Sequence, residues 1–362
     1  MADHNSMMKQ WQFTRSGKPR DILTITEIPI PTTCPDDELL IKISYVSLNS
    51  AILHRLMAYR GVFDPVGAFR SRPSVPEKDF SGIVCDLRGA NVKGFNTGDR
   101  VFGMGPTAFR EIGRGVLCEY ALIKQDSLVK VPDNISMKDA ACFPVAGFTA
   151  YCFLIEKAQL KKGDKVFING GSGAVGVMVI QLARTIVGPT GLVVATCTAA
   201  KSDAIRNLGA DEIIDYTAHD LPAFLREHYS SRPFDAIFDT VGSDHILYSS
   251  SPAYLTPEGL FCAIGLVDFG STVWAGTKRI LQLLSAMMVP VYLGGVPRRY
   301  IFEPLKVSHV RMLAMAKLVE DKAFKAVIDS TYKFDNVLDA YDRLVSRQVI
   351  GKVVIEVNAD HD

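Results

Sequence analysis

A glycine-rich segment between two apolar runs carries the clearest chemistry of this chain. Residues 165–169 predict a short buried strand, and residues 174–187 have the apolar spacing of a helix. The segment between them is therefore a strand-to-helix turn. Glycine lets such a turn approach a pyrophosphate, whose charge meets the amide groups at the helix start. Because residues 192–196 predict the next strand, the motif indicates a dinucleotide-binding unit rather than a tight turn without a ligand. The motif reads Gly171, Ser172, Gly173, Ala174, Val175, Gly176.

The residues that follow the second predicted strand indicate which nicotinamide cofactor binds. NAD-binding units place Asp or Glu there, where the carboxylate holds the ribose 2′-hydroxyl and repels a 2′-phosphate. Residues 197–201 contain no acid, and they offer the hydroxyl of Thr198 and the cation of Lys201. This pattern favours NADPH over NADH. The alternative is that Lys201 is a solvated residue opening the next helix.

The composition narrows the classes of partner and compartment. The 362 residues are enough for two domains, and 40 basic against 39 acidic residues give a net charge of +1, so nothing favours nucleic acid. Seven cysteines without a C-x-x-C pair favour a reduced protein, and together with the lack of an apolar signal segment they predict a cytoplasmic location. Residues 281–295 are apolar, but they are too short, and interrupted by Pro290, to form an integral membrane segment.

The pattern of predicted elements changes near residue 140. Before it, strand-like runs such as 38–46 and 80–85 are separated by turns and predict a β-rich domain. From residue 141 onward, strands and helices alternate. This alternation implies an α/β architecture in which helices cover both faces of a parallel sheet. A last strand-like run occupies residues 351–357.

Several motifs, in their order along the chain, resemble the medium-chain dehydrogenase/reductase superfamily. The resemblance is to its zinc-independent, quinone oxidoreductase-like branch, which includes zeta-crystallin and enoyl reductases. It implies a GroES-like β-barrel catalytic domain (1–140 and 310–362) and a doubly wound Rossmann domain that binds NADPH (141–309). The active site is then expected between the two domains. The motifs are residues 45–49, 72–84, 115–121, 140–151, 327–332 and 351–355.

The same resemblance suggests roles for single residues. Asn49, at a strand end, is expected beside the nicotinamide ribose and the substrate, although it could instead cap a turn. Tyr59 is a candidate proton donor or a packing residue, and Tyr216 is expected near the adenosine phosphate unless it covers the core edge. Further cofactor contacts are expected at Thr149, Val241, Gly265 and Leu266, besides the glycine-rich motif, Thr198 and Lys201.

The sequence predicts no metal site. Zinc-dependent relatives need a Cys after an early strand, a Gly-His-Glu turn and a later Cys, because thiolate and imidazole are the ligands that zinc takes. Lys78 lies where the ligand His would fall, and Leu48 and Asn49 lie around the first position. His54 is an isolated histidine in an apolar run, which is more typical of a core or cleft residue than of a ligand.

Without zinc to polarise an alcohol, hydride delivery from NADPH to a small electrophile is the favoured chemistry. The acceptor would be an activated C=C, in an enone, enal or enoyl thioester, or a quinone. Residues 50–52 lack the Pro and Asp that the family usually has there. This departure keeps open an NADPH-binding regulatory or scaffold protein with little turnover. Residues 281–295 suggest a peripheral membrane contact. Residues 287–292 suggest a homodimer through the Rossmann domain, unless they pack against the chain's own catalytic domain.

Overall fold

The chain divides into two compact units, each described here by itself. In this computed structural model, unit 1 comprises Met1–Phe148 and Lys306–Asp362, and unit 2 comprises Thr149–Leu305. The junctions therefore lie at 148/149 and 305/306, whereas the sequence suggested 140/141 and 309/310. The structure describes residues 6–33, 35–57, 73–87, 94–106, 114–242, 245–265, 281–282, 284–304 and 306–358.

Unit 1 is built on a seven-stranded sheet with β3 at its centre. The strand order is β14-β15-β3-β4-β5-β7, and β6 also pairs with β3. β3 is buried at nine of its ten positions and therefore on both faces, so it lacks the alternating burial of a half-exposed strand. The strands are β3 (Glu38–Ser47), β4 (Asp79–Asp86), β5 (Arg100–Met104), β6 (Tyr120–Lys124), β7 (Leu128–Lys130), β14 (Ile328–Lys333) and β15 (Lys352–Glu356).

A separate antiparallel pair and several helices complete unit 1. Among the helices, α5 has Ser136 as its N-cap, and the Ser136 side chain accepts a hydrogen bond from the backbone N–H of Asp139. The pair consists of β1 (Met7–Gln12) and β2 (Thr24–Pro29). The helices are α1 (Pro19–Ile22), α2 (Ser50–Met57), α5 (Met137–Ala140), α12 (His309–Glu320) and α13 (Val337–Val345), with 3-10 turns at Gln125–Ser127 and Phe334–Asn336 and with α6 (Pro144–Tyr151) at the junction.

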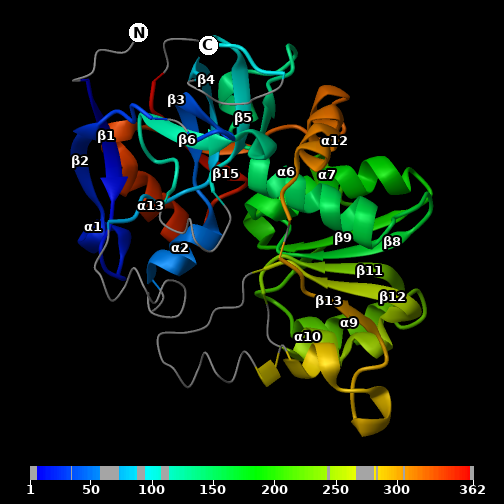
Figure 1. The fold of residues 1–362 in the computed structure, drawn as a ribbon. Helices are drawn as coiled ribbons and strands as arrows, with labels where there is room; N and C mark the ends of the chain where they lie inside the picture. The colour runs from blue at the N-terminus through cyan, green and yellow to red at the C-terminus, as the bar shows by residue number, and fades with distance from the viewer. Residues whose placement is uncertain are drawn as a thin grey trace. The chain divides into compact units, whose positions relative to one another are not determined.

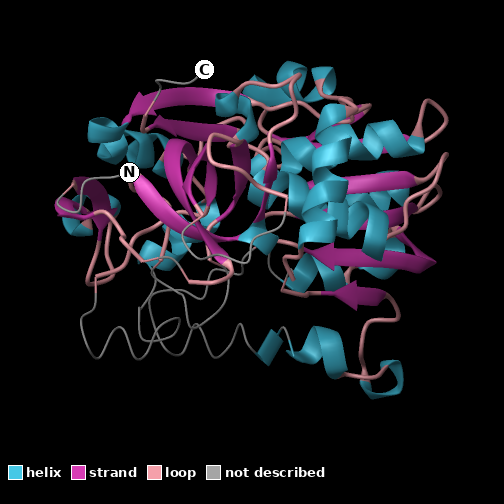
Figure 2. Ribbon diagram, turned by 45° about the horizontal axis from the view of Figure 1, so that its top comes forward, coloured by secondary structure: helices cyan, strands magenta, loops and turns pink. Residues whose placement is uncertain are grey.

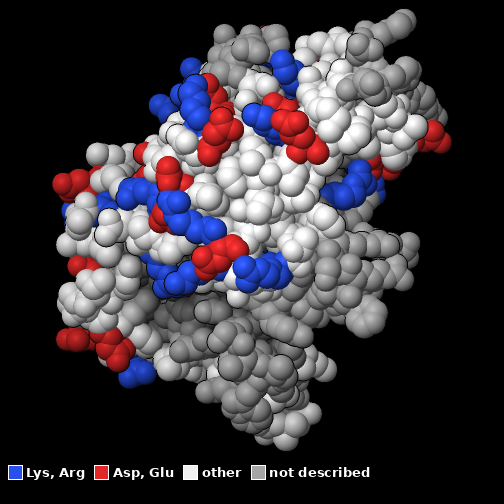
Figure 3. All heavy atoms as spheres, turned by 90° about the vertical axis from the view of Figure 1, so that its left-hand side faces the viewer, with Lys and Arg blue, Asp and Glu red and all other residues white. Residues whose placement is uncertain are grey.

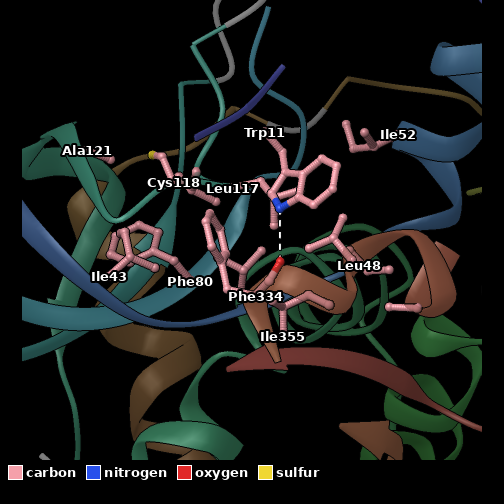
Figure 4. Close-up of a cluster of buried hydrophobic side chains, with 14 of the residues drawn as sticks. Trp11, Ile43, Leu48, Ile52, Phe80, Leu117, Cys118, Ala121, Phe334 and Ile355 are labelled. Carbon is pink, nitrogen blue, oxygen red and sulfur yellow. Dashed lines mark hydrogen bonds between the residues drawn. The ribbon is translucent and has the colours of Figure 1, made fainter. Parts of the chain in front are cut away.

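The core of unit 1 joins residues from both ends of the chain. Trp11 is 5% exposed and packs among buried side chains such as Phe80 and Ile355 (Figure 4). Its indole N–H donates a hydrogen bond to the backbone carbonyl oxygen of Phe334, 2.9 Å away. This bond satisfies the one polar atom of a large apolar side chain. The N-terminal strand is thus tied to the C-terminal segment that starts at residue 306.

Unit 2 is a doubly wound parallel sheet. Its strand order, β10-β9-β8-β11-β12-β13, becomes 3-2-1-4-5-6 when the strands are numbered within the unit, which is the Rossmann order. The order reverses between β8 and β11, and this confirms the predicted fold class. The strands are β8 (Lys165–Asn169), β9 (Leu192–Cys197), β10 (Glu212–Asp215), β11 (Phe234–Asp239), β12 (Leu255–Ala263) and β13 (Arg299–Ile301).

Helices cover both faces of this sheet. Figure 1 shows α7 on one side and α9 and α10 on the other, and Figure 2 shows the strands between the helices. α7 ends at Val187, and its C-cap is Gly188, whose φ of +65° is a backbone conformation that favours glycine. The elements are α7 (Ala174–Val187), α8 (Ser202–Asn207), α9 (Leu221–Tyr229) and α10 (His245–Ser249), a π-helix at Cys152–Lys157, and 3-10 turns at Ala199–Lys201, Ser251–Ala253 and Val291–Leu293.

The described surface has mixed charge and carries an apolar stretch in unit 2. On the face in Figure 3, basic and acidic side chains are interspersed, as the nearly equal numbers of basic and acidic residues suggest. In unit 2, Met288 is 72% exposed and Tyr292 is 85% exposed. Within the described part of the chain, no helix has both the length and the apolar character needed to cross a membrane. The six described cysteines are all free thiols.

Candidate functional site

The glycine-rich turn lies at the carboxyl end of β8, where the strand order of unit 2 reverses. Gly170, with φ +86°, starts the turn. Its N–H donates to the side-chain oxygen of Thr196, and the N–H of Gly171 donates to the Thr196 carbonyl oxygen, both at 2.8 Å. Beneath the turn, buried Asn169 accepts a hydrogen bond from the Thr196 hydroxyl and donates one to Asp239. These bonds fix the turn to β9 and β11.

The glycines let helix α7 start close to the strand ends. A Cβ atom built on Gly176 would lie 2.2 Å from the carbonyl oxygen of Gly170, and one on Gly171 would lie 3.0 Å from Ala195 and Ile180. Gly173 is the N-cap of α7, and no side chain among the described residues caps it. The first N–H groups of the helix, at Ala174 and Val175, therefore remain available to an anion.

The residues that follow β9 lie against this turn. Thr198 is the N-cap of the 3-10 turn Ala199–Lys201, and the Lys201 ammonium donates to the hydroxyl of Ser172 at 3.5 Å. The structure thus brings together the glycine-rich motif and the cation that sequence reasoning assigned to the 2′-phosphate. A phosphate near Ser172 would meet a positive charge.

An acid that sequence reasoning missed also reaches this segment. Asp215, at the end of β10, accepts a hydrogen bond from the N–H of Ala199 at 3.1 Å. Hydrogen bonds from the hydroxyl and the N–H of Thr217 lower the pKa of Asp215. The register that pairs Asp215 with Cys197 brings the acid there, and a linear motif does not reveal that register.

The other predicted cofactor residues lie at several positions. Gly265 follows β12, and a Cβ atom on it would lie 2.1 Å from the N atom of Gly242, so the two strand ends approach closely. Val241 and Tyr216 are exposed, at 55% and 52%, beyond the ends of β11 and β10. Thr149 is buried within α6. Leu266 and Tyr59 lie outside the described residues.

Unit 1 contains a buried polar network around Asn49. Its amide nitrogen donates to the Ser47 carbonyl oxygen and to the Glu77 carboxylate, each at 3.2 Å, and its amide oxygen accepts from the Lys352 ammonium at 3.0 Å. Both amide hydrogens of Asn49 are therefore donated within the protein. Asn49 is 6% exposed. This geometry suits a positioning role better than donation to a substrate.

Glu77 is the second centre of the network. One carboxylate oxygen accepts from the Tyr341 hydroxyl at 2.7 Å, and the other accepts from the backbone N–H of Asn49 at 3.0 Å. Burial raises the pKa of Glu77 to about 7, although these hydrogen bonds and the charge of Lys352 act in the opposite direction. With φ +66°, Glu77 has a left-handed backbone, a conformation that residues other than glycine seldom adopt.

A buried ion pair closes the network. The Lys352 ammonium is 2.8 Å from Asp79, and both side chains are fully buried. The other carboxylate oxygen of Asp79 accepts from the backbone N–H of Val145 at 2.9 Å. Sequence reasoning singled out none of Glu77, Asp79, Lys352 and Tyr341 as functional. The sequence offered one signal for this network, which is Lys352 beside the apolar residues of β15. A lysine buried there without a partner of opposite charge would destabilise the fold.

Two family models match the chain, and curated relatives match nearly all of it. The models describe an alcohol dehydrogenase GroES-like domain at residues 35–133 and a zinc-binding dehydrogenase at 208–355. A trans-enoyl reductase of Penicillium oxalicum is 32% identical, with 98% of each chain covered. The solved quinone oxidoreductase of Coxiella burnetii is 25% identical with a TM-score of 0.76, covering 97% of this chain and 100% of that one.

The chain belongs to the medium-chain dehydrogenase/reductase family, in its quinone oxidoreductase-like branch. The resemblance drawn from the sequence is therefore confirmed. A mycobacterial protein solved with NADPH shares the fold, with a TM-score of 0.76 at 21% identity and with 97% and 100% of the two chains covered.

The described side chains of this medium-chain family member show which potential metal ligands lie close together. Among them, no group of three or more His, Cys, Asp or Glu residues is arranged to hold a metal ion. Lys78, at the position that the resemblance gives to a zinc-ligand histidine, lines a pocket of unit 1. An ammonium ion is not a zinc ligand.

Proposed function

We propose that this chain is an NADPH-dependent, zinc-independent reductase that delivers hydride to an activated C=C or to a quinone. Its relatives support the general reaction. Besides the trans-enoyl reductase, a 2-methylene-furan-3-one reductase of tomato is 30% identical over 97% of this chain and 79% of its own. A chloroplastic quinone-oxidoreductase homolog of spinach is 29% identical over 97% of this chain and 98% of its own. Two of these relatives are named as reductases and the third as a homolog of a quinone oxidoreductase.

One observation carries the cofactor part of the proposal. The Lys201 ammonium contacts Ser172 of the glycine-rich turn, at the switch point of a Rossmann sheet. The space that a Cβ of Gly176 would fill, and the uncapped start of α7, fit a pyrophosphate. When bound, NADPH supplies the hydride. The turn would hold its pyrophosphate, and Thr198 and Lys201 would hold its 2′-phosphate.

Unit 1 would supply the residues around the acceptor. Asn49 is proposed to act in the reaction as a positioning residue. Its amide group is held by hydrogen bonds to Glu77 on one side and from Lys352 on the other. Tyr59 stays the candidate proton donor, with water as the alternative.

A cytoplasmic location, and a homodimer through the exposed apolar stretch of unit 2, remain part of the proposal. Light scattering tests the dimer.

The decisive experiment measures NADPH oxidation with three classes of acceptor: quinones, enals and enoyl thioesters. We expect turnover with at least one class, slower turnover with NADH, and a loss of turnover in Asn49→Ala without a change in NADPH affinity. The alternative, a regulatory NADPH-binding protein, predicts tight NADPH binding without turnover on any acceptor. Asn49→Ala with wild-type turnover would remove Asn49 from the site.

A further inference from the structure

The carboxylate of Asp215 lies beside the segment that is proposed to hold the 2′-phosphate of NADPH. β10 pairs with β9 in parallel, and the register places Asp215, the last residue of β10, opposite Cys197, the last residue of β9. The segment from Thr198 to Lys201 begins at the next residue of the chain. Two neighbouring strand ends therefore bring an acid and a cation to the same edge of the sheet.

Hydrogen bonds fix the position of this carboxylate. Its Oδ2 atom accepts from the backbone N–H of Ala199 at 3.1 Å. Its Oδ1 atom accepts from the backbone N–H and from the hydroxyl of Thr217, at 2.9 and 2.6 Å. One oxygen is thus bound to the turn after β10 and the other to the segment after β9. The N–H of Ala199, between Thr198 and Lys201, already has an anionic acceptor.

The negative charge of Asp215 acts on the end of β9. The hydrogen bonds from Thr217 lower the pKa of Asp215, so the carboxylate is charged at neutral pH. At the neighbouring thiol of Cys197, burial raises the pKa most, and the charge of Asp215 raises it further. The charges of Lys201 and Arg206 act there in the opposite direction and more weakly. A phosphate held by Lys201 would therefore also be exposed to the field of Asp215.

The two nicotinamide cofactors should respond differently to this charge. In Rossmann units, an acid at the end of the second strand binds the ribose 2′-hydroxyl and repels a 2′-phosphate. Here the acid comes from the end of the third strand, β10, and reaches the same segment through Ala199. NADH carries no charge at the 2′ position, so the repulsion acts mainly on NADPH.

We propose that Asp215 is a specificity-determining residue that lowers the affinity for NADPH relative to NADH, in opposition to Lys201. The preference for NADPH is then the difference between attraction by Lys201 and repulsion by Asp215. This inference rests on the proposed binding of NADPH at Thr198 and Lys201. It does not depend on the acceptor or on turnover.

Fluorescence titration of NADPH and NADH against the parent and Asp215→Asn tests the proposal. We expect the ratio of NADPH affinity to NADH affinity to rise about three- to tenfold in Asp215→Asn at low salt, because a repelling charge is removed. The rise should shrink at high salt, since ions screen a partly exposed carboxylate. In competition titrations, 2′,5′-ADP should gain over 5′-AMP by a similar factor, which assigns the effect to the 2′-phosphate.

Further variants separate charge from local structure. Asp215→Ser is a second neutral variant and should show the same rise, also if Asp215→Asn does not fold. Thr217→Val removes one hydrogen bond but keeps the charge, and it should keep the parental ratio. Glu227→Gln removes an exposed charge of α9 and should change nothing.

The outcomes distinguish this inference from the proposed function. A ratio that stays unchanged or falls in the neutral variants, while both cofactors still bind, would overturn the role of Asp215 and leave the cofactor proposal intact. A parent protein that binds neither cofactor would overturn both. A parent that binds NADPH without reducing any acceptor would overturn only the reductase proposal.

Discussion

Replacing Glu77 by Gln tests whether its carboxyl group is held neutral in the folded protein. The side chain is 1% exposed and accepts hydrogen bonds from Tyr341 and Asn49. Gln keeps one oxygen for the Asn49 donors and places an amide N–H beside the Tyr341 hydroxyl, which can rotate to accept it. The substitution therefore preserves the shape of the network and removes the titration.

The magnitude follows from the pKa of Glu77, which rises from 4.5 to about 7. Below pH 4.5 the carboxyl is neutral in both the folded and the unfolded state. Between 4.5 and 7 the unfolded chain releases the proton while the folded chain keeps it, so folding stability falls as the pH rises. At about 1.36 kcal/mol per pH unit, the loss amounts to roughly 3 kcal/mol and is complete above pH 7.

Urea unfolding between pH 5 and 8 measures this loss. Trp11 fluorescence reports on unit 1, in a Trp274→Phe background that removes the second tryptophan. We expect Glu77→Gln to lose about 2.5 kcal/mol less than the parent over this range, because part of the loss has already occurred at pH 5. Glu27→Gln, at an exposed position of β2, should keep the parental pH profile. The reasoning is refuted if Glu77→Gln keeps that profile too.

Three further predictions address other parts of the structure. Lys352→Met should destabilise unit 1 by about 3–5 kcal/mol because it leaves Asp79 buried without its partner, and adding Asp79→Asn should restore part of the loss in urea unfolding; no restoration would contradict the ion-pair argument. Lys201→Ala should weaken NADPH binding by about 1–3 kcal/mol and leave NADH binding unchanged in fluorescence titrations; equal losses for both cofactors would show that it does not contact the 2′-phosphate. Gly176→Ala should lower the melting temperature and weaken both cofactors, because the added methyl group meets the carbonyl oxygen of Gly170 and such overpacking costs about 1–3 kcal/mol; unchanged melting would exclude the predicted clash.

The glycine-rich turn and the order of elements in unit 2 were predictable from the sequence. Their signals are local: an apolar run of strand length, glycines at fixed spacing, and a helical period in the residues after them. Lys201 follows the next strand by a few residues, so its position beside the turn also follows from the βαβ geometry. The Rossmann order extends this local regularity over the whole sheet.

The network around Asn49 was not predictable in the same way. Glu77 and Tyr341 are hydrogen-bonded across 264 positions of the sequence, and Lys352 and Asn49 across 303. Such pairs depend on the register of β15 against β3 and on the position of α13. Periodicity identifies each element but does not give its partner. For the same reason the sequence did not reveal the role of Asp215. Asp215 accepts a hydrogen bond from Ala199 because β10 pairs with β9.

The discontinuity of unit 1 has a consequence for its biosynthesis. The residues Tyr45, Val46 and Ser47 of β3 pair with β15, whose last residue is Glu356. The described strands of unit 2 are complete by Ile301, so this unit can fold while the chain is still being made. The end of β3 must wait until the residues of β15 have been made, and closing so long a loop is slow. Until then the nascent protein exposes an unpaired strand edge, a site for mispairing or for a chaperone.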